Sequence, residues 1–252
     1  MTACSTEDDL GEMLGIAINR LDVSVIPAAL RRRISLPAKL AINAALNACN
    51  RADVEAAETP SLFVSVGGEM VITDQLCLDL TKPVVHISPT QFHNSVHNTA
   101  AAYWSIVTGC QQASTAMAAG EQTIAMALVE AWGQLATQGG NLLLVCYEER
   151  WPEYIEPGYG FHDIAFAMLL SAEANHLTIG QCSRPRVEQQ PIHVNDQLAS
   201  LIDAVPILAL TPFFQALLAQ SEEQLIPISL QPQPWVIDFI ATESIQQIGL
   251  SQ

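Results

Sequence analysis

Charge is scarce in this sequence, and positive charge is the scarcest. Only 14% of its 252 residues are charged, where about 25% is usual for a globular domain, and 10 Lys and Arg stand against 26 Asp and Glu. The formal net charge of −16 would repel a phosphate backbone, which argues against a nucleic-acid-binding protein. Half of the residues are apolar, which excludes a disordered chain and leaves little polar material to cover the surface. The composition therefore predicts a folded protein with an extensive partner interface.

The sequence also lacks the features that mark secreted, membrane and zinc-binding proteins. Its start has neither the basic nor the apolar region of a signal peptide. No apolar stretch is long enough for a membrane span, because Glu130 and Gly139-Gly140 interrupt the longest candidates. The six cysteines include no C-x-x-C pair, which argues against a disulfide framework or a zinc knuckle. We therefore expect a cytoplasmic protein with reduced thiols.

Apolar patterning predicts alternating strands and helices. Strands are expected near residues 15–18, 61–67, 84–87, 141–147, 166–171, 177–180 and 235–239, and helices over 27–50, 95–107, 115–137 and 212–220. Ser35 is the candidate N-cap of the main helix in 27–50, with Pro37 in its first turn. The segment Asn141–Tyr147 is continuously apolar, as in strands that are buried on both faces of a layered α/β protein. We expect one α/β domain, residues 1–252, with a less regular tail from about residue 183.

The most informative feature is a charge-poor segment, which runs from Pro83 to Tyr147. It contains no Lys or Arg and only two acidic residues, Glu121 and Glu130. A surface helix normally has a charged face, and the two helices expected in this segment have almost none. A core within a monomer would explain one such helix. For the whole segment we favour a subunit interface.

The run Ser-Thr-Ala-Met-Ala-Ala-Gly, from Ser114 to Gly120, is expected to open the second of these helices. Small residues allow a sharp turn, and the free N–H groups at a helix N-terminus would activate a cysteine there. The residue present is Met117, which has no proton to give and is a poor nucleophile. On spacing alone, the favoured interpretation is the start of a core helix.

Two segments together resemble the N-terminal half of β-ketoacyl synthases. In those enzymes an S-P…N-x-x-A segment with a following Ile precedes a T-A-C-x-x-G nucleophile elbow. Here Ser88-Pro89 begins such a segment, Asn98, Ala101 and Ile106 fall at matching places, and Met117 falls on the cysteine. The runs F-H-N-S-V-H-N (92–98) and W-V-I-D-F (235–239) further resemble the ketoacyl-synthase-like N-terminal-domain family, which includes the chain length factor of aryl polyene biosynthesis.

The resemblance implies a thiolase-like α/β fold, equivalent to the N-terminal half of a ketosynthase. One mixed sheet would be layered with helices, and a helix over Thr115–Ala136 would be buried near the centre. The resemblance also implies a heterodimer, or a higher-order assembly, with a catalytic ketosynthase subunit. An acyl carrier protein would be an indirect partner. Neither a cofactor nor a metal is expected.

The resemblance further implies a non-catalytic chain, truncated relative to a full ketosynthase. Met117 replaces the nucleophilic cysteine, and after residue 176 only His193 remains. His193 lies outside any motif that matches the two histidines with which the family decarboxylates malonyl-carrier protein. The link between Ile106 and Ser114 is also shorter than in true synthases and lacks their Gly-Pro. An alternative therefore stays open, a stand-alone acyltransferase or hydrolase that uses Cys110 or Ser114.

A chain length factor places side chains across the end of an acyl tunnel and limits product length by steric exclusion. By position, Phe92 and Val96 would point to that end, with Thr99 and Tyr103 continuing the same helix face and Asn98 nearby at the interface. Ordinary core packing explains Phe92 and Val96 equally well.

Two histidines are candidate metal ligands. His93 and His97 are four residues apart, as zinc ligands on one helix face are. No third ligand stands at a recognisable spacing, so hydrogen bonding in a core or interface is the favoured interpretation.

Arg31, Arg32 and Arg33 are the one local basic group. They are interpreted as a solvated helix end, with a contact to a carrier protein or partner as the alternative. Carrier proteins are acidic, so the main basic docking patch is expected on the ketosynthase.

Overall fold

The computed structural model describes residues 21–155, 163–219 and 224–242. The strand expected near residues 15–18 lies outside the described residues. The helices are α2 (Leu36–Arg51), α3 (Met70–Leu80), α4 (Pro89–Asn94), α5 (Thr99–Thr108), α6 (Thr123–Gln138), α7 (Asp196–Ala204) and α8 (Thr211–Leu218), with short 3-10 helices η1 (Val23–Val25), η2 (Ala56–Glu58), η3 (Gly120–Gln122) and η4 (Pro206–Leu210). The strands are β1 (Ser61–Val64), β2 (Ser114–Met117), β3 (Asn141–Glu148), β4 (Ile164–Ser171), β5 (Gly180–Cys182), β6 (Arg186–Val187), β7 (Gln224–Ser229) and β8 (Trp235–Ala241).

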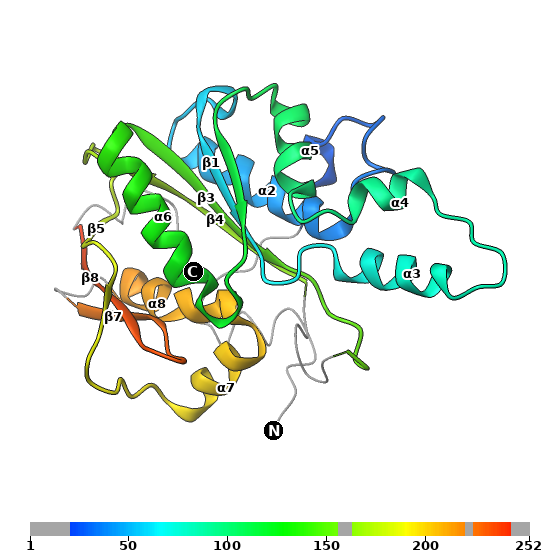
Figure 1. The fold of residues 1–252 in the computed structure, drawn as a ribbon. Coiled ribbons are helices and arrows are strands. Elements are labelled where there is room, and N and C mark those ends of the chain that lie inside the picture. The colour runs from blue at the N-terminus through cyan, green and yellow to red at the C-terminus, as the bar shows by residue number, and fades with distance from the viewer. Residues whose placement is uncertain (1–20, 156–162, 220–223, 243–252) are drawn as a thin grey trace.

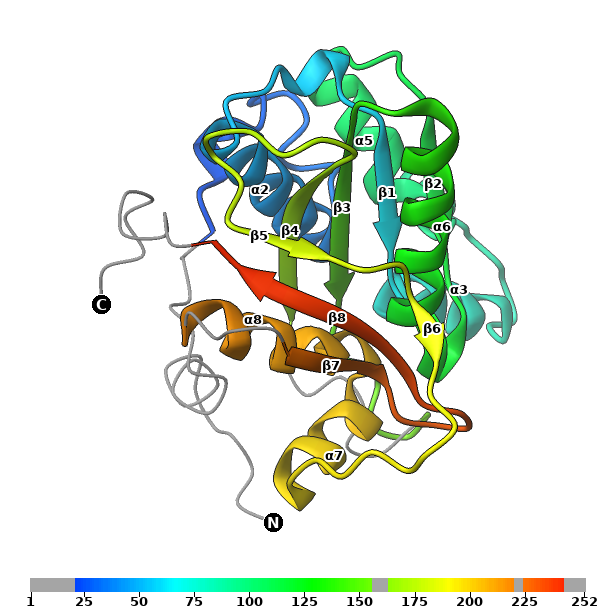
Figure 2. The same cartoon turned by 90° about the vertical axis from the view of Figure 1, so that its left-hand side faces the viewer.

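The first sheet has the strand order β2-β1-β3-β4 (Figure 2). Strand β1 pairs in parallel with both β2 and β3, and β4 runs antiparallel to β3 along all eight of its residues. The chain thus forms the mixed α/β sheet that the sequence predicts, with β2 as one of its edges.

Strand β3 is buried on both faces, as its apolar run predicts. Leu142, Leu144 and Cys146 join one hydrophobic cluster, and the residues between them in the sequence, such as Leu143 and Val145, join another. Each of these side chains is at most 1% exposed. Because successive side chains of a strand point to opposite faces, this one strand contributes to the cores on both sides of the sheet.

Helices cover both faces of the first sheet (Figure 1). Side chains of α2 and α5 pack on one face, and those of α6, η4 and α8 pack on the other. A second sheet, β5-β8-β6 with β7 paired to β8, lies beyond η4 and α8 and contributes residues of β7 and β8 to the same core (Figure 2).

The start of α2 agrees with its sequence signals. Ser35 is the N-cap, its hydroxyl oxygen accepts the N–H of Ala38, and Pro37 lies in the first turn. An N-cap bond satisfies a donor that the helix itself leaves free, which stabilises a helix by about 1 kcal/mol. The residues before it, including the three arginines at 31–33, form turns and not the expected helix end.

The segment Ser114–Gly120 does not open a helix, so the expectation of a helix over Thr115–Ala136 is wrong in its first part. Its first four residues form β2, and α6 begins only at Thr123. The register places Ser114 opposite Ser61, whose hydroxyl oxygen lies 2.9 Å from that of Ser114. Pairing with β1 outweighs the helical propensity of this small-residue sequence.

The helix expected over residues 95–107 begins four residues later in the structure, as α5, and a separate short helix, α4, precedes it. Helix α4 ends at Asn94 and α5 begins at Thr99, with a turn between them. The Thr99 hydroxyl donates to the carbonyl oxygen of Asn94 over 3.1 Å, which fastens the start of α5 to the end of α4. A buried side chain that bonds the preceding turn in this way competes with a continuous helix.

Two further expectations differ from the structure. Residues 84–87 form no strand, and the region after residue 183 is not an irregular tail, since it contains α7, η4, α8, β7 and β8. Polar, proline-containing sequence between 183 and 196 suggested a loop, but the apolar residues that follow it supply one side of the core.

Substitution of two glycines by alanine is expected to have opposite effects on stability. A Cβ on Gly180 would lie 2.3 Å from the buried ring of Phe239, whereas a Cβ on Gly133, inside α6, would meet nothing within 4 Å. We expect Gly180→Ala to lower the free energy of unfolding by about 1–3 kcal/mol through overpacking. We expect Gly133→Ala to raise it by about 0.5–1 kcal/mol through helix propensity. Urea unfolding of the two variants measures both, and equal effects of the two variants would contradict this packing of β5 on β8.

Candidate functional site

The three parallel strands bring three turns together at one edge of the first sheet. Strands β1, β2 and β3 run in the same direction, so the residues after Val64, Met117 and Glu148 all leave the sheet at its carboxyl edge. In α/β proteins this edge is where ligands and catalytic groups are usually found. The backbone joins two of these turns directly, because the N–H of Ser65 donates to the carbonyl oxygen of Met117 over 3.4 Å.

Met117 ends β2 and is followed by a tight turn into α6. Its partly buried side chain packs against the core on the α6 side of the sheet. Gly120 has a φ of +56°, a left-handed conformation that suits glycine. The Thr123 hydroxyl accepts the N–H of Ala119 at 3.0 Å and donates to the carbonyl oxygen of Gly120 at 2.7 Å. The chain therefore builds a sharp turn after Met117, whose thioether is neither a nucleophile nor a proton donor.

Glu148, the last residue of β3, binds the turn that follows β1. Its carboxylate accepts the N–H of Val66 at 2.7 Å, the N–H of Gly67 at 3.0 Å and the hydroxyl of Ser65 at 3.1 Å. The indole N–H of Trp151 also donates to it, at 3.4 Å. Burial raises the pKa of Glu148, and these donors oppose the rise because they favour the carboxylate.

Two more buried glutamates lie beside this turn. The Ser35 hydroxyl donates to Glu69 over 2.7 Å, and the N–H of Val71 donates to Glu149 over 2.7 Å. Burial raises the pKa of Glu69 to about 7. It raises the pKa of Glu149 to about 8, with further contributions from the negative charges of Glu69, Asp163 and Glu148. Sequence reasoning missed these three acids, although Glu148-Glu149 directly follows a buried strand and Glu69 follows Gly67-Gly68.

The two candidate histidines occupy different environments. The Nε2 atom of His97 lies 2.9 Å from the carbonyl oxygen of Ser65, and the Tyr147 hydroxyl donates to the carbonyl oxygen of His97 over 3.2 Å. His93 lies in α4, where its ring meets the edge of Tyr103 at a centroid distance of 5.8 Å. They do not share a helix face. Within the described ranges, no three His, Cys, Asp or Glu side chains are arranged to hold a metal ion.

The candidate tunnel residues divide into exposed and buried ones. Phe92 in α4 is 64% exposed and Val96 in the following turn is 45% exposed, whereas Thr99 and Tyr103 in α5 are 1% and 4% exposed. Asn98 lies exposed directly before α5. The expectation that Phe92 and Val96 share one helix face with Thr99 and Tyr103 is therefore wrong, because the chain turns between the two helices.

Asn94 connects the two helices to the turn before α2. Its side chain, 3% exposed, donates to the carbonyl oxygen of Arg33 over 2.6 Å and accepts the hydroxyl of Tyr103 over 3.0 Å. A buried side-chain amide with both of its ends bonded specifies one arrangement of its neighbours. Asn94 thus fixes where α4 presents Phe92.

A family model described as β-ketoacyl synthase, N-terminal domain, matches residues 11–231 of the chain. The chain belongs to this family. The match spans the charge-poor segment, the carboxyl edge with Met117, and the helices that follow. No curated protein matches the chain.

Solved ketosynthase structures resemble this β-ketoacyl synthase N-terminal domain. A chain of the ketosynthase ApeO in complex with its chain length factor ApeC, from Xenorhabdus doucetiae, has a TM-score of 0.66 and 18% identity, over 94% of this chain and 93% of that chain. A chain of the complex AntDE:AntF, a type II acyl-carrier protein with its ketosynthase, has a TM-score of 0.63 and 12% identity, over 92% of each chain. The ishigamide ketosynthase/chain length factor gives a TM-score of 0.50 and 17% identity, over 65% of this chain and 51% of that chain. These similarities show the thiolase-like fold of ketosynthases.

The three arginines before α2 differ in their contacts. The Arg31 guanidinium donates to the carbonyl oxygens of Ile26 and Ser24, at 2.7 and 3.1 Å, so it stabilises its own turn. Arg32 and Arg33 are exposed. Only these two side chains of the group remain candidates for a carrier or partner contact.

The alternative nucleophiles lack a base. Cys110 is 4% exposed and its thiol lies 3.6 Å from the carbonyl oxygen of Thr59, while Ser114 bonds Ser61. In the part of the chain that the structure describes, no histidine forms a hydrogen bond with either residue. The arrangement does not favour a stand-alone acyltransferase or hydrolase at these positions.

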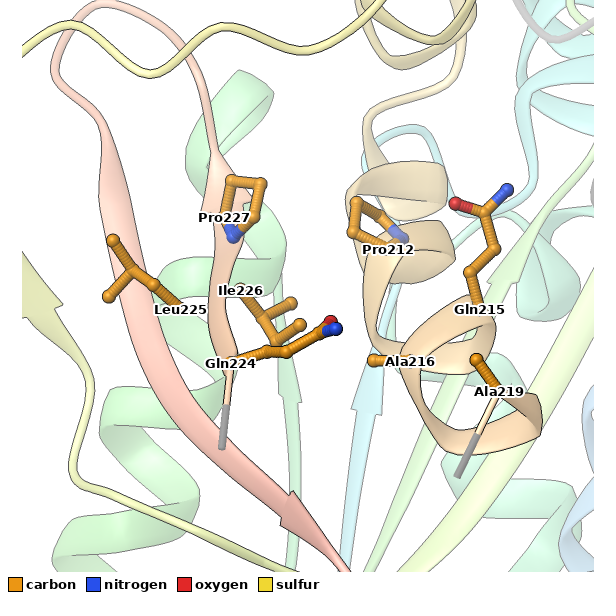
Figure 3. Close-up of a pocket in the computed structure, with 8 residues that line it drawn as sticks. All are labelled: Pro212, Gln215, Ala216, Ala219, Gln224, Leu225, Ile226 and Pro227. Atoms are coloured by element: carbon orange, nitrogen blue, oxygen red, sulfur yellow. The ribbon is translucent and has the colours of Figure 1, made fainter. Parts of the chain in front are cut away.

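A shallow groove of about 300 Å³ lies between α8 and β7 (Figure 3). Ile226 and Gln224 face Ala216 across it, and Leu225 points to the other side of the strand (Figure 3). Its lining contains no titratable side chain, so it offers no group for acid–base or nucleophilic chemistry. No helix in the described ranges is long and apolar enough to cross a membrane.

Thiol labelling tests the alternative nucleophile. Cys77 is exposed and Cys110 is buried, so we expect iodoacetamide to label Cys110 at least about tenfold more slowly than Cys77 in the native protein. Peptide mass spectrometry measures both rates, and labelling in urea, where the two should react alike, is the control. A Cys110 that reacts as fast as Cys77 would return it to the list of candidate nucleophiles.

Proposed function

We propose that this chain is a non-catalytic chain length factor, which pairs with a catalytic ketosynthase and bounds its acyl tunnel in aryl polyene biosynthesis. The observation that carries the proposal is the surface of the charge-poor segment. That segment supplies core residues and also exposes seven large apolar side chains, each 40–66% exposed: Val84, Val85, Ile87, Phe92, Val96, Ile106 and Trp132.

The two helices of this segment support an interface because each is covered on one face only. Helix α5 buries Trp104 completely and leaves Ile106 59% exposed. Helix α6 buries Ile124 completely and leaves Trp132 49% exposed. Scattered apolar residues are ordinary on a surface. A segment with no basic residue that exposes seven of them is typical of a protein interface.

Strand β2 supports the same surface. It is an edge strand of the first sheet and pairs with β1 alone among the described residues. An edge strand leaves backbone N–H and C=O groups free, and proteins usually cover such an edge or protect it with charges. The sequence of β2, Ser-Thr-Ala-Met, contains no charge. A partner that covers β2, Ile106 and Trp132 would bond the free backbone groups of the strand and bury the exposed apolar side chains of α5 and α6.

We infer that the chain is non-catalytic from the residues at the carboxyl edge of the first sheet. Met117 has no thiol, and the carboxylate that dominates this edge, Glu148, is committed to the turn after β1. The thiol and the general acid or base would then come from the ketosynthase. This chain would contribute shape.

Of the candidate tunnel residues, Phe92 and Val96 are the ones we propose to meet the growing acyl chain. They are exposed on the partner-facing segment, whereas Thr99 and Tyr103 are buried in their own chain. We assign these two to holding the α4–α5 turn in position, and we keep the exposed Asn98, directly before α5, as an interface residue. The whole chain is proposed to act as one domain, since the hydrophobic cluster on the α6 side of the first sheet unites residues from Leu62 to Phe239.

Pairing with the ketosynthase is tested by co-expression and by mass in solution. We expect a 1:1 complex by size exclusion with light scattering when the chain is expressed with the ketosynthase encoded beside it. Ile106→Glu should weaken the complex by at least about 2 kcal/mol, because it buries an unpaired charge. Leu225→Glu, at a residue 47% exposed on β7, is the matched control. A monomer that ignores the ketosynthase would contradict the proposal.

Product length tests the steric role. We expect Phe92→Trp and Val96→Trp to shorten the longest product of the intact complex, because added bulk at the tunnel end excludes longer chains. Leu218→Trp, at an exposed residue of α8, should leave the products unchanged. Mass spectrometry of the released chains measures the distribution. An unchanged distribution in an intact heterodimer would remove Phe92 and Val96 from the tunnel.

A further inference from the structure

Three glutamates at the carboxyl edge form a buried cluster, which we call the carboxyl cluster. Glu69, Glu148 and Glu149 are 1%, 0% and 5% exposed. They come from the ends of two neighbouring parallel strands, since Glu69 follows the turn after β1, Glu148 ends β3 and Glu149 comes directly after it. The charge of Glu149 is affected by both Glu69 and Glu148, so the three groups act on one another.

No positive charge balances the carboxyl cluster in the described part of the chain. The two ion pairs found there join Lys82 to Asp79 and Arg186 to Asp238, and neither includes a member of the cluster. Its titratable neighbours are Tyr103 of α5, Tyr147 of β3 and Asp163 before β4. Arg33 acts on Tyr103, but no Lys or Arg of the described residues is among the charges that act on the cluster itself. From α2 it receives only the neutral hydroxyl of Ser35. Three unpaired carboxylates in one buried volume would carry a large desolvation and repulsion cost.

Hydrogen bonds distinguish the members of the cluster. Glu148 accepts four donors and is suited to remain a carboxylate, whereas Glu69 and Glu149 accept one each. The Oε2 atom of Glu69 is buried and has no hydrogen-bond partner. A buried, unpartnered carboxyl oxygen is tolerated far better on a neutral acid than on a charged one. This oxygen therefore indicates a bound proton at Glu69.

The cluster also fastens a projecting part of the molecule. The N–H groups of Val66, Gly67 and Val71 all donate to its carboxyl groups. These residues lead into α3, which extends away from the two sheets beside α4 (Figure 1). Helix α3 exposes Val71, Leu78 and Leu80 by 47–57%, so few of its own contacts hold it to the body.

We propose that the carboxyl cluster is a proton-dependent latch, which is closed when Glu69 and Glu149 hold protons and releases the turn before α3 when they lose them. In the closed state Glu148 is the one charged carboxylate of the cluster. The neutral Glu69 accepts the hydroxyl of Ser35, the neutral Glu149 accepts the N–H of Val71, and neither repels Glu148. When Glu69 and Glu149 ionise, three negative charges share one buried volume, and opening of the turn lets water reach them.

The pH range of the latch follows from linkage. Burial raises the pKa of Glu69 from 4.5 to about 7 and that of Glu149 from 4.5 to about 8. In the open turn these carboxyls are hydrated and titrate near their ordinary value. The closed state is therefore fully favoured below about pH 4.5, loses stability as the pH rises towards 7–8, and changes no further above about pH 8.

Amide hydrogen exchange of the full-length chain tests the latch. Exchange is followed from pH 5 to 9 and expressed as protection relative to the chemical exchange rate at each pH. We expect protection of residues 66–71 to fall about tenfold per pH unit for each proton released between pH 5 and 7, and to level off above pH 8. Protection of β3 should stay unchanged over the same range. A flat profile for residues 66–71 would overturn the proposal, as would an equal loss in β3, which would indicate global destabilisation.

Variants separate the latch from general pH effects. The double variant Glu69→Gln, Glu149→Gln imitates the protonated pair, so residues 66–71 should stay protected up to pH 9. Glu173→Gln, at an exposed acid outside the carboxyl cluster, should keep the wild-type profile. A double variant that keeps the wild-type pH dependence would overturn the proposal. If the double variant fails to fold, the test uses the wild-type profile and the single variant Glu149→Gln. In this variant the protection of residues 66–71 should fall less steeply with pH than in the wild type, and an equal slope would overturn the proposal.

Discussion

Strand β3 is buried on both faces, and the other layers of the molecule are arranged around it. Full burial of a leucine is worth about 1.5–3 kcal/mol, and β3 contributes alternate residues such as Leu143 and Leu144 to two separate clusters. Because both of its faces must be covered, helices are needed on each side of the sheet. Helices α2 and α5 cover one face, while α6, η4 and α8 cover the other and in turn support the second sheet.

The direction of β3 decides where polar chemistry gathers. Its parallel pairing with β1 brings the carboxyl ends of β1, β2 and β3 to one edge, so residues far apart in the sequence meet there. Glu148 lies at the end of a strand that is paired on both sides, and it accepts the free N–H groups of the turn after β1. The same edge holds Met117. The carboxylate of Glu148 at this edge thus bonds the backbone of the turn after β1.

The charge-poor segment has two structural roles at once. Trp104 and Ile124 are fully buried in the two cores, whereas Ile106 and Trp132, on the same helices, remain about half exposed. A helix can do this because its side chains radiate around the axis, so that Trp104 and Ile106, two positions apart, point to nearly opposite faces. These half-exposed apolar side chains, on a segment without Lys or Arg, are the physical basis of the proposed pairing.

The sequence by itself determined the elements whose signals are local. Ser35 and Pro37 mark the start of α2, and the apolar run from residue 142 marks a strand that is buried on both faces. The sequence also shows that residue 117, at the end of β2, is a methionine and so has no thiol. These features depend on a residue's own chemistry or on spacing along one element.

Only the tertiary structure decided the features that depend on pairing between distant segments. Residues 114–117 are a strand because β1 supplies hydrogen bonds, although their composition favours a helix. Asn94 ends α4 because Arg33 and Tyr103 bond its side chain. The acids Glu69 and Glu149 look like ordinary surface residues in the sequence. They become buried, and their pKa values rise, because folding brings the end of β3 against the turn after β1, where no Lys or Arg of the described residues forms an ion pair with them.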